Sequence, residues 1–246
     1  MILGIDTAGA TASVALVHDG RLLAERVCPN LRPRASRSTI SSPKGNHAEV
    51  LIPLIQELFE ETGKSLEDLT GIGVSIGPGS FTGLRIGLAT AKGIAYERGL
   101  PVAGVSTLHA NAARVENFDG TICPLLDARK REVYAALFRS SRWRLERMTE
   151  DELTTVDKAL ARAQSLAGDG ALGLVGDGAR AYEKVIERGL GGGALFFDTG
   201  SVAGAVARLA EGRLGAGDSD DLGVLAPLYL RPSEAESKLG KSHLTY

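Results

Sequence analysis

The sequence predicts an α/β protein with two lobes, each a mixed sheet with flanking helices, and three observations support this class. Short apolar runs alternate with helical patterns in both halves of the chain. A strand-turn-strand pattern opens each half, at residues 1–27 and at residues 122–139. The length of 246 residues allows one large domain or two lobes of about 100–140 residues. We divide the chain into lobes of residues 1–108 and 109–246, with a seam at residues 117–121.

The composition is that of an ordinary globular protein. Hydrophobic residues make up 43% of the chain and the mean hydropathy is +0.01. The net charge of −2 gives no general attraction to nucleic acid. No apolar window approaches 18 residues, and the start of the chain lacks a charged segment followed by a long apolar one, so we expect a cytoplasmic protein without membrane contact. Cys28 and Cys123 are far apart in the sequence and lack the spacing of metal ligands, so two reduced thiols are favoured over a disulfide.

The first 27 residues predict a three-stranded meander. Its strands are residues 1–6, 13–17 and 21–27, and Asp19-Gly20 forms the second turn. Asp6 and Thr7 lie where the first strand passes into a turn of small residues. Sugar kinases, actin and heat-shock ATPases place an acid there, beside nucleotide phosphates and metal. The other interpretation is an aspartate that caps the turn.

Residues 29–45 predict an exposed basic loop that precedes a helix. The loop has several prolines and serines, and its cations have no acid among them. It is a solvated linker or a local contact for phosphate or an acidic partner. The helix covers residues 47–62, with Pro53 inside it and apolar residues on one broad face: Val50, Leu51, Leu54, Ile55, Leu58 and Phe59. His47 lacks a histidine at i+4, so a polar helix start is favoured over a metal ligand.

A glycine-rich loop lies between an apolar run, residues 72–76, and a second helix, residues 82–98. The loop residues are Gly77, Pro78, Gly79, Ser80, Phe81 and Thr82. Glycine and proline suit a sharp turn or a close backbone approach. Ser80 or Thr82 can cap the helix. The lysine of a phosphate loop is missing, so the loop is either a structural turn or a site for an anion or a partner.

The second helix has an unusually smooth face. Gly83, Gly87 and Ala91 recur at a spacing of four residues. Each glycine inside a helix costs roughly 0.5–1 kcal/mol relative to alanine, so close packing must compensate for it. We expect a second helix on this face, from this chain or from a partner. Arg85 in the first turn opposes the helix dipole and gains from a nearby carboxylate or a bound anion.

The remaining elements alternate between strand and helix. After Pro101 we predict a strand over 101–105, a helix over 107–115 capped by Ser106, and strands over 122–126 and 132–139 around a charged turn. Helices over 155–167, 179–189 and 201–214 and a strand over 173–175 follow. Gly176-Asp177-Gly178 either floors an adenosine site or forms a strand-to-helix turn.

These segments together resemble the bacterial TsaB family, also called YeaZ. The residues that carry the resemblance run in order along nearly the whole chain: Ile5-Asp6-Thr7 with Ser13-Val14-Ala15, His47-Ala48-Glu49 with Leu51 and Pro53, the loop from Gly77 to Gly87, Gly104-Val105-Ser106-Thr107-Leu108, Asp127-Ala128-Arg129 with Glu132-Val133-Tyr134, and Tyr229-Leu230-Arg231. The central loop is the most specific of these. The basic stretch from Leu31 to Gly45 departs from the family pattern in its length.

The resemblance implies an actin-like, hexokinase-type (ASKHA) fold and a cytosolic role in making threonylcarbamoyladenosine in tRNA. It implies a TsaD-like catalytic subunit and a TsaE-like ATPase as partners, a homodimer when the chain is alone, and tRNA only through the complex. The family's contact helices correspond to residues 47–62 and 82–98. The implied partner-binding residues are His47, Leu51, Leu54, Ile55, Leu58, Gly83, Arg85, Gly87 and Ala91. A degenerate nucleotide site is implied at Asp6, Thr7, Asp127, Arg129, Gly176 and Gly178.

The sequence does not predict catalysis by the chain alone. Its histidines, His18, His47, His109 and His243, form no pair at helical spacing, so one helix cannot build a metal site. Residues 127–130 have side chains where a nucleotide-binding member of the fold has consecutive glycines. We expect a scaffold with no metal and no tightly bound cofactor. The alternatives are an active small-molecule kinase or ATPase, with Asp6 as metal anchor and Asp127 as base, and a homodimeric regulator unrelated to tRNA.

Overall fold

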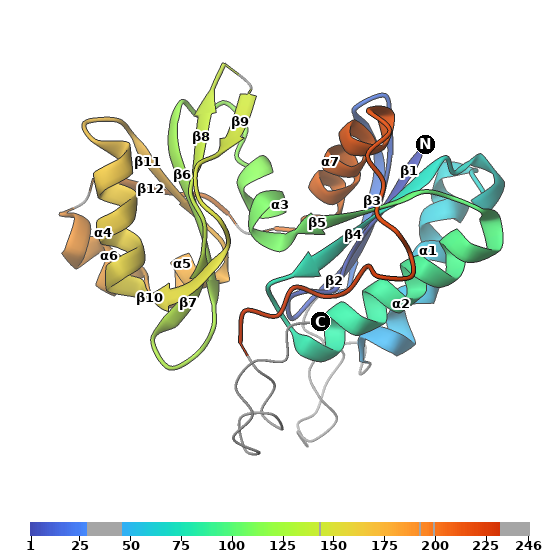
Figure 1. Ribbon diagram of the computed structural model, residues 1–246, viewed down its shortest axis with the longest axis horizontal. Helices are drawn as coiled ribbons and strands as arrows, with labels where there is room; N and C mark the ends of the chain where they lie inside the picture. Colours follow the sequence, from blue (N-terminus) through green and yellow to red (C-terminus); the bar gives the residue numbers. More distant parts are fainter. Residues whose placement is uncertain (29–45, 143, 192, 199, 232–246) are drawn as a thin grey trace. The chain divides into compact units, whose positions relative to one another are not determined.

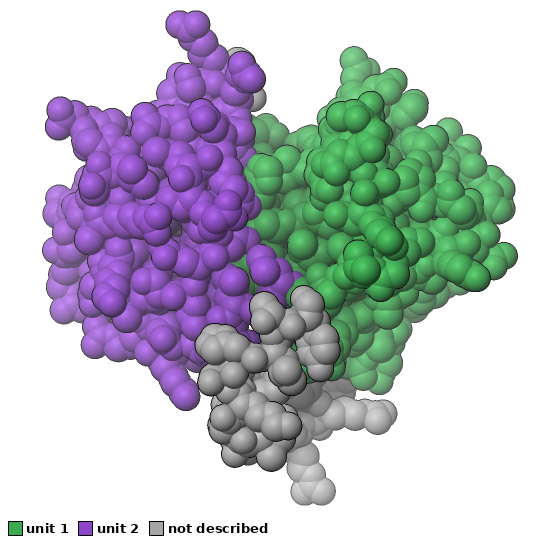
Figure 2. All heavy atoms as spheres, in the orientation of Figure 1, with its two compact units in different colours: residues 1–116, 199–227 green, residues 117–198, 228–246 purple. Residues whose placement is uncertain are grey.

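The computed structural model describes residues 1–28, 46–142, 144–191, 193–198 and 200–231, which fall into two compact units (Figure 2). Unit 1 spans Met1–Glu116 and Thr199–Pro227, and unit 2 spans Asn117–Asp198 and Leu228–Tyr246. This division differs from the expected boundary after residue 108, because the chain returns to unit 1 near its end. The basic loop of residues 29–45 lies outside the described residues.

Unit 1 is built on a five-stranded sheet of order β3-β2-β1-β4-β5 (Figure 1). The strands are β1 (Ile2–Asp6), β2 (Ala12–His18), β3 (Arg21–Cys28), β4 (Gly71–Gly77) and β5 (Val102–Ser106). The first three pair antiparallel, as the meander pattern predicts, and β1, β4 and β5 pair parallel. The α/β class with mixed sheets is confirmed.

Two long helices pack on one face of this sheet. Helix α1 (His47–Thr62) begins at Asn46, whose side chain accepts the amides of Ala48 and Glu49. Helix α2 (Phe81–Arg98) begins at Ser80, and the short 3-10 helix η1 (Leu66–Asp68) lies between them in the chain. Leucine, isoleucine and valine side chains from the helices and the sheet form one core.

Helices α7 (Ala203–Gly215) and α3 (Thr107–Ala113) belong to the second core of unit 1. The sequence assigned residues 201–214 to the second lobe, but α7 packs on β1, β2 and β4. Glycines in the sheet make room for it, because a Cβ on Gly4 would lie 2.2 Å from the Ala203 carbonyl oxygen. The reason for the misassignment is therefore a long-range backbone contact that sequence order does not show.

Unit 2 contains a seven-stranded sheet of order β10-β7-β6-β11-β12, with β8 paired to β6 and β9 paired to β8. The strands are β6 (Gly120–Asp127), β7 (Glu132–Ala135), β8 (Phe138–Ser141), β9 (Arg144–Arg147), β10 (Glu152–Thr155), β11 (Leu172–Val175) and β12 (Ala194–Phe196). The helices are α4 (Val156–Ala167), α5 (Asp177–Ala181) and α6 (Glu183–Leu190).

Two predicted elements of unit 2 are interrupted. The strand predicted over 132–139 is two strands, because the chain leaves the ladder at Ala136 and Leu137, and the Leu137 amide donates to the Thr149 hydroxyl at 2.9 Å. The helix predicted over 179–189 is two helices that meet at Tyr182. Strands β9, β10 and β12 were not predicted.

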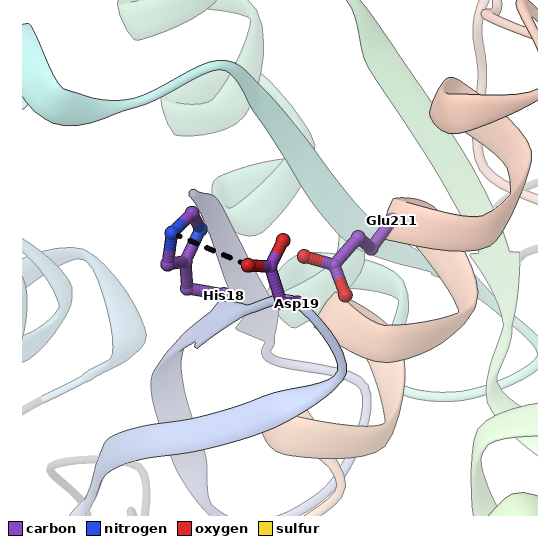
Figure 3. Close-up of side chains that lie close together, drawn as sticks. All are labelled: His18, Asp19 and Glu211. Atoms are coloured by element: carbon purple, nitrogen blue, oxygen red, sulfur yellow. Dashed lines mark ion pairs between the residues drawn. The ribbon is translucent and has the colours of Figure 1, made fainter.

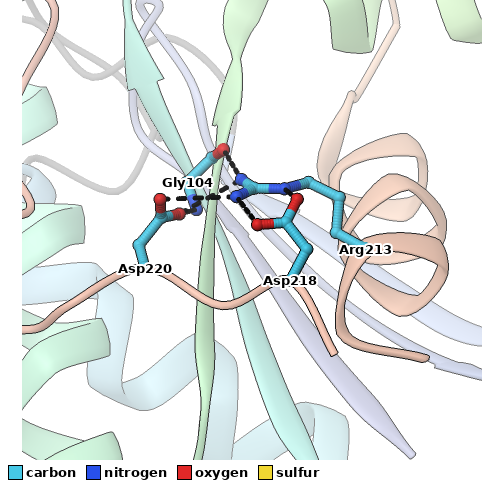
Figure 4. Close-up of polar contacts among 4 residues, drawn as sticks. All are labelled: Gly104, Arg213, Asp218 and Asp220. Atoms are coloured by element: carbon cyan, nitrogen blue, oxygen red, sulfur yellow. Dashed lines mark hydrogen bonds and ion pairs between the residues drawn. The ribbon is translucent and has the colours of Figure 1, made fainter. Parts of the chain in front are cut away.

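The outer edge of β5 is covered by the chain that follows α7 (Figure 4). Asp220 pairs with Val102 as an isolated bridge, and its carboxylate accepts the Gly104 amide at 2.7 Å. Arg213 donates to the Gly104 carbonyl oxygen at 2.8 Å and pairs with Asp218 and Asp220. These contacts satisfy backbone groups that an open edge strand would leave exposed.

Cys28 and Cys123 are buried free thiols, as expected. Among the described residues, no helix combines the length and the apolar character that a bilayer crossing requires.

Candidate functional site

The glycine-rich loop after β4 docks on the turn that follows β1. The Ser80 amide donates to the Ala8 carbonyl oxygen at 2.7 Å, and a Cβ on Gly79 would lie 2.5 Å from that same oxygen. The Ser80 hydroxyl accepts the Gly83 amide at 3.2 Å, so Ser80 is the helix cap. The loop therefore has a structural role within unit 1.

Gly83 and Gly87 of the smooth face of α2 pack against the same turn. A Cβ on Gly83 would lie 2.0 Å from the Thr7 carbonyl oxygen, and one on Gly87 would lie 2.2 Å from Thr7 Oγ1. The Thr7 hydroxyl donates to the Gly83 carbonyl oxygen at 2.7 Å. At Gly83 and Gly87 the neighbour is therefore the β1–β2 turn of the same unit, where a second helix was expected. Ala91 packs in the core that includes residues of α1.

Most of the residues implied as partner contacts on α1 and α2 are buried in unit 1. Leu51, Leu54, Ile55 and Leu58 pack in its core, and Ala91 packs there too. A side chain closed off within its own fold cannot touch a second protein, so partner binding does not fit these residues. The apolar periodicity of α1 marks the face that covers the sheet.

His47 and Arg85 are the two implied contacts that stay accessible. His47 Nε2 lies 3.2 Å from the Gly9 carbonyl oxygen. The Arg85 guanidinium stacks over the ring of Phe81 at 3.9 Å from the centroid. Stacking on an aromatic ring was not among the expected explanations for a cation in this first turn.

The solvent-facing side of α2 has a different set of residues, which we call the α2 stripe: Phe81, Arg85, Ala89, Gly93 and Tyr96. Their spacing of four, four, four and three residues keeps them on one side of a helix. Tyr96 is 84% exposed and Phe81 is 37% exposed. Nothing lies within 4 Å of the position that a Gly93 Cβ would take. On α1, Ile52 is 47% exposed.

The sequence reasoning overlooked Gly93, Tyr96 and Ile52. An exposed tyrosine and an exposed isoleucine look like core residues until the buried face of each helix is known. The small residues Ala89 and Gly93 could have indicated this exposed surface in the sequence, because they form a second row of small residues along α2.

Asp6 is closed off from solvent at the end of β1. It is 4% exposed, and Oδ1 accepts the Ala8 amide at 3.3 Å. Burial raises the pKa of the Asp6 carboxyl above its ordinary value. A metal anchor for a nucleotide needs an open, ionised oxygen ligand with room for water on the cation. Asp6 in this fold does not meet that requirement.

Asp6→Asn is expected to be more stable than the wild-type protein, and this difference in the free energy of unfolding should grow as the pH increases. In the folded protein the pKa of Asp6 is raised above 3.8, its value in an unfolded chain. The protonated carboxyl therefore contributes fully to the free energy of unfolding below pH 3.8. That contribution is lost as the pH rises through the folded-state pKa. Asparagine lacks this loss. Urea unfolding midpoints at pH 4 and pH 7 measure the difference, and a less stable variant at pH 7 would mean that the ionised carboxylate is stabilising.

The second group of implied nucleotide residues lies in unit 2. Asp127 Oδ1 accepts the Arg129 amide at 2.8 Å and the Tyr182 hydroxyl at 3.0 Å. The Asp127 amide donates to Asp177 Oδ1 at 3.0 Å. Burial raises the pKa of the Asp177 carboxyl. Asp127 is thus held by internal hydrogen bonds that fix the turn, which is a poor arrangement for a general base.

Gly176 and Gly178 are used for packing. A Cβ on Gly176 would lie 2.2 Å from the Leu125 carbonyl oxygen, and one on Gly178 would lie 2.9 Å from Leu125 and Leu126 backbone atoms. Strand β6 therefore fills the space above both glycines, and they form a strand-to-helix turn. Apart from the exposed Arg129, the residues of the implied degenerate nucleotide site make contacts within their own units.

One cluster of possible metal ligands lies at the β2–β3 turn: His18, Asp19 and Glu211 (Figure 3). Their ligand atoms lie within 4.8 Å of one another, and His18 is 3.7 Å from Asp19. Glu211 Oε2 accepts the Gly20 amide at 2.7 Å. Helical spacing could not reveal this group, because α7 brings Glu211 to a turn 191 residues away. We assign it a structural role, since Glu211 ties the turn to α7.

The sequence is similar to a known protein family and to individual proteins of known name. The family model described as TsaD, tRNA N6-adenosine threonylcarbamoyltransferase, matches residues 39–187. The chain is 31% identical over 239 residues to tRNA threonylcarbamoyladenosine biosynthesis protein TsaB of Bacillus subtilis, covering 96% of each. It is 37% identical over 141 residues to the Escherichia coli protein of the same name, covering 56% of this chain and 54% of that one.

Solved structures confirm the fold. A Pseudomonas aeruginosa protein described as YeaZ matches with a TM-score of 0.70 at 24% identity, covering 93% of this chain and 99% of that one. Component A of the (R)-2-hydroxyglutaryl-CoA dehydratase of Acidaminococcus fermentans matches with a TM-score of 0.50 at 13% identity, covering 87% of this chain and 98% of that one. The expected ASKHA-type fold is thereby confirmed.

Proposed function

The chain belongs to the TsaB family, and from this premise we propose that it acts in tRNA threonylcarbamoyladenosine biosynthesis as a scaffold without catalytic activity of its own. Its partners are a TsaD-like catalytic subunit, which docks on α1 and α2, and a TsaE-like ATPase, which joins the pair. In the absence of these partners, two copies pair through the same helices. The tRNA is engaged only in the complex.

The α2 stripe is the observation that supports this docking. It combines exposed aromatic side chains with small residues, and such a combination lets another backbone approach closely while the rings anchor it. Tyr96 is 84% exposed, and tyrosine is among the residue types enriched at protein interfaces and their energetic hot spots. Arg85 adds a planar cation beside Phe81, and arginine is common at interface centres.

The internal contacts that the implied nucleotide residues make, within the described part of the chain, support the scaffold role over the kinase alternative. Among the described residues, Asp6 is buried, and Asp127 accepts hydrogen bonds from the Arg129 amide and the Tyr182 hydroxyl. Gly176 and Gly178 are filled by β6. Isothermal titration of the isolated chain with Mg-ATP tests this directly, and micromolar binding with turnover would establish the kinase or ATPase alternative.

Replacing Gly93 by leucine is expected to lower the affinity for a TsaD-like subunit at least tenfold. Leucine fills the open space above Gly93 and keeps the opposing backbone away, whereas the fold of unit 1 has no contact there to lose. Titration of the purified subunits gives the affinity. Reconstitution with the TsaD-like and TsaE-like subunits, tRNA, ATP and a threonylcarbamoyl donor then shows whether product formation requires the chain.

Gly212→Leu on α7 is the matched control. Gly212 is an exposed helical glycine of unit 1 with nothing within 4 Å of its Cβ position, and α7 covers the opposite face of the sheet. It should bind as wild type does. A Gly93→Leu protein that assembles at wild-type affinity would exclude the α2 stripe, and a wild-type chain that is dispensable for product would refute the scaffold role.

A further inference from the structure

The turn between β6 and β7 carries three consecutive cations in the left-handed backbone region, and we call it the basic turn. Arg129, Lys130 and Arg131 have φ values of 65°, 55° and 61°. Residues with a side chain adopt this region at a conformational cost that glycine avoids. Elsewhere in the described chain, positive φ values fall on glycines such as Gly63 and Gly191 and on three isolated residues with side chains, Asp19, Asn117 and Arg142. At the basic turn three consecutive residues with side chains adopt this region, and all three are cations.

The three cations are presented to solvent at the end of a hairpin. All of them are exposed, and the Arg129 side chain is 86% exposed at 3.8 Å from Asp127. Within the described part of the chain, the side chains of Lys130 and Arg131 form no ion pair. Adjacent like charges repel each other, and a bound anion removes that repulsion.

The base of the basic turn is held in place from several sides. Asp127 accepts the Arg129 amide and the Tyr182 hydroxyl, which joins the turn to the α5–α6 junction. Arg231 donates to the Ala128 carbonyl oxygen and pairs with Glu132. A loop that is already ordered loses little conformational entropy on binding, so its charges are available for recognition.

We propose that the basic turn contacts the phosphates of the tRNA bound by the assembled complex. The inference rests on the proposed function, which brings a tRNA to the complex. With a net charge of −2, the chain as a whole does not attract RNA, and the basic turn is a local group of cations that does. Arginine and lysine are the usual phosphate ligands, and such contacts position the RNA without reading its sequence.

The double variant Lys130→Gly, Arg131→Gly tests the inference in the assembled complex. Glycine keeps the left-handed backbone and removes both charges. With an unmodified transcript of a tRNA that reads codons starting with A, we expect affinity to fall roughly five- to tenfold near 0.1 M salt. The plot of log affinity against log salt concentration should become less steep, its negative slope shrinking in magnitude by about 1–2. The melting temperature should stay equal or rise, which separates lost charge from lost structure.

Arg142→Gly is the matched control, because Arg142 is another exposed arginine of unit 2 at a positive φ, 49°. Its complex should bind the transcript as wild type does. A double variant with unchanged affinity for the transcript and unchanged salt dependence would overturn the inference. A double variant that no longer binds the TsaD-like subunit but keeps its affinity for the transcript would overturn it as well. A wild-type complex that fails to assemble or to bind tRNA would refute the proposed function instead.

Discussion

Replacing Gly83 by alanine is expected to destabilise unit 1 by about 3 kcal/mol or more, or to prevent its folding. The added Cβ would lie 2.0 Å from the Thr7 carbonyl oxygen, and the Thr7 hydroxyl already holds the Gly83 carbonyl at 2.7 Å. The atom in the way belongs to the backbone, so a change of rotamer cannot relieve the clash. Relief requires that α2 move away from the β1–β2 turn. Denaturant unfolding of the purified variants measures the effect.

Gly93→Ala in the same helix provides the matched control. Its Cβ meets nothing within 4 Å, and alanine favours a helix interior over glycine by up to about 1 kcal/mol. The variant should therefore be as stable as wild type or more so. Equal stabilities for Gly83→Ala and Gly93→Ala would show that α2 does not pack on Thr7. Gly87, which also faces Thr7, belongs with Gly83 and does not suit a test of partner binding.

Replacing Arg213 by alanine is expected to release the chain segment that covers β5 and to lower stability by about 2 kcal/mol, on the usual scale for hydrogen bonds to charged groups. Arg213 joins the Gly104 carbonyl to the Asp220 carboxylate, which accepts the Gly104 amide. Without the guanidinium, Asp220 keeps its charge beside the strand edge. Leu225, which lies near Gly104, would also lose its support. Hydrogen exchange should show a less protected Gly104 amide.

Arg208→Ala is the control for Arg213, because both residues are on α7. Arg208 pairs with Glu116 across 3.3 Å, and both side chains are substantially exposed. Arg208 also donates to the Gly20 carbonyl oxygen at 3.2 Å, at an exposed position. Exposed pairs contribute about 0–1 kcal/mol, so its unfolding midpoint should change much less than that of Arg213→Ala. Lysine at position 213 should recover only part of the stability, since an ammonium cannot make the planar, forked contacts of arginine. An unchanged Gly104 exchange rate in Arg213→Ala would refute the role of this network.

Local signals predicted most elements of the fold. The bounds of α1 follow from its period and its glycine C-cap, and those of α2 follow from the caps at Ser80 and Gly99. The β1–β3 meander follows from alternation and the Asp-Gly turn. Strands β9, β10 and β12 are three or four residues long, too short for alternation to distinguish them from loops.

The candidate surface was predicted at the level of helices and not of residues. Both helices could be located, but the exposed side of α2 could not be distinguished from the buried one. Gly83 and Gly87 form one smooth row, and Ala89 and Gly93 form another. Periodicity detects such rows without saying which is covered. The turn that covers the first row lies 76 residues earlier in the chain.

By itself, the sequence determined the α/β class and the ends of the main helices, because caps, turn residues and hydrophobic periods act over a few neighbouring positions. The resemblance to the TsaB family rests on motifs spread along the chain, and the similarity to known relatives shows the membership. Only the tertiary structure decided that Thr7 occupies the smooth face of α2, that α7 completes unit 1 and that Asp6 is sealed from solvent. The physical reason is that burial depends on which distant segment packs against a surface, and a local pattern is the same whether that segment belongs to its own chain or to another.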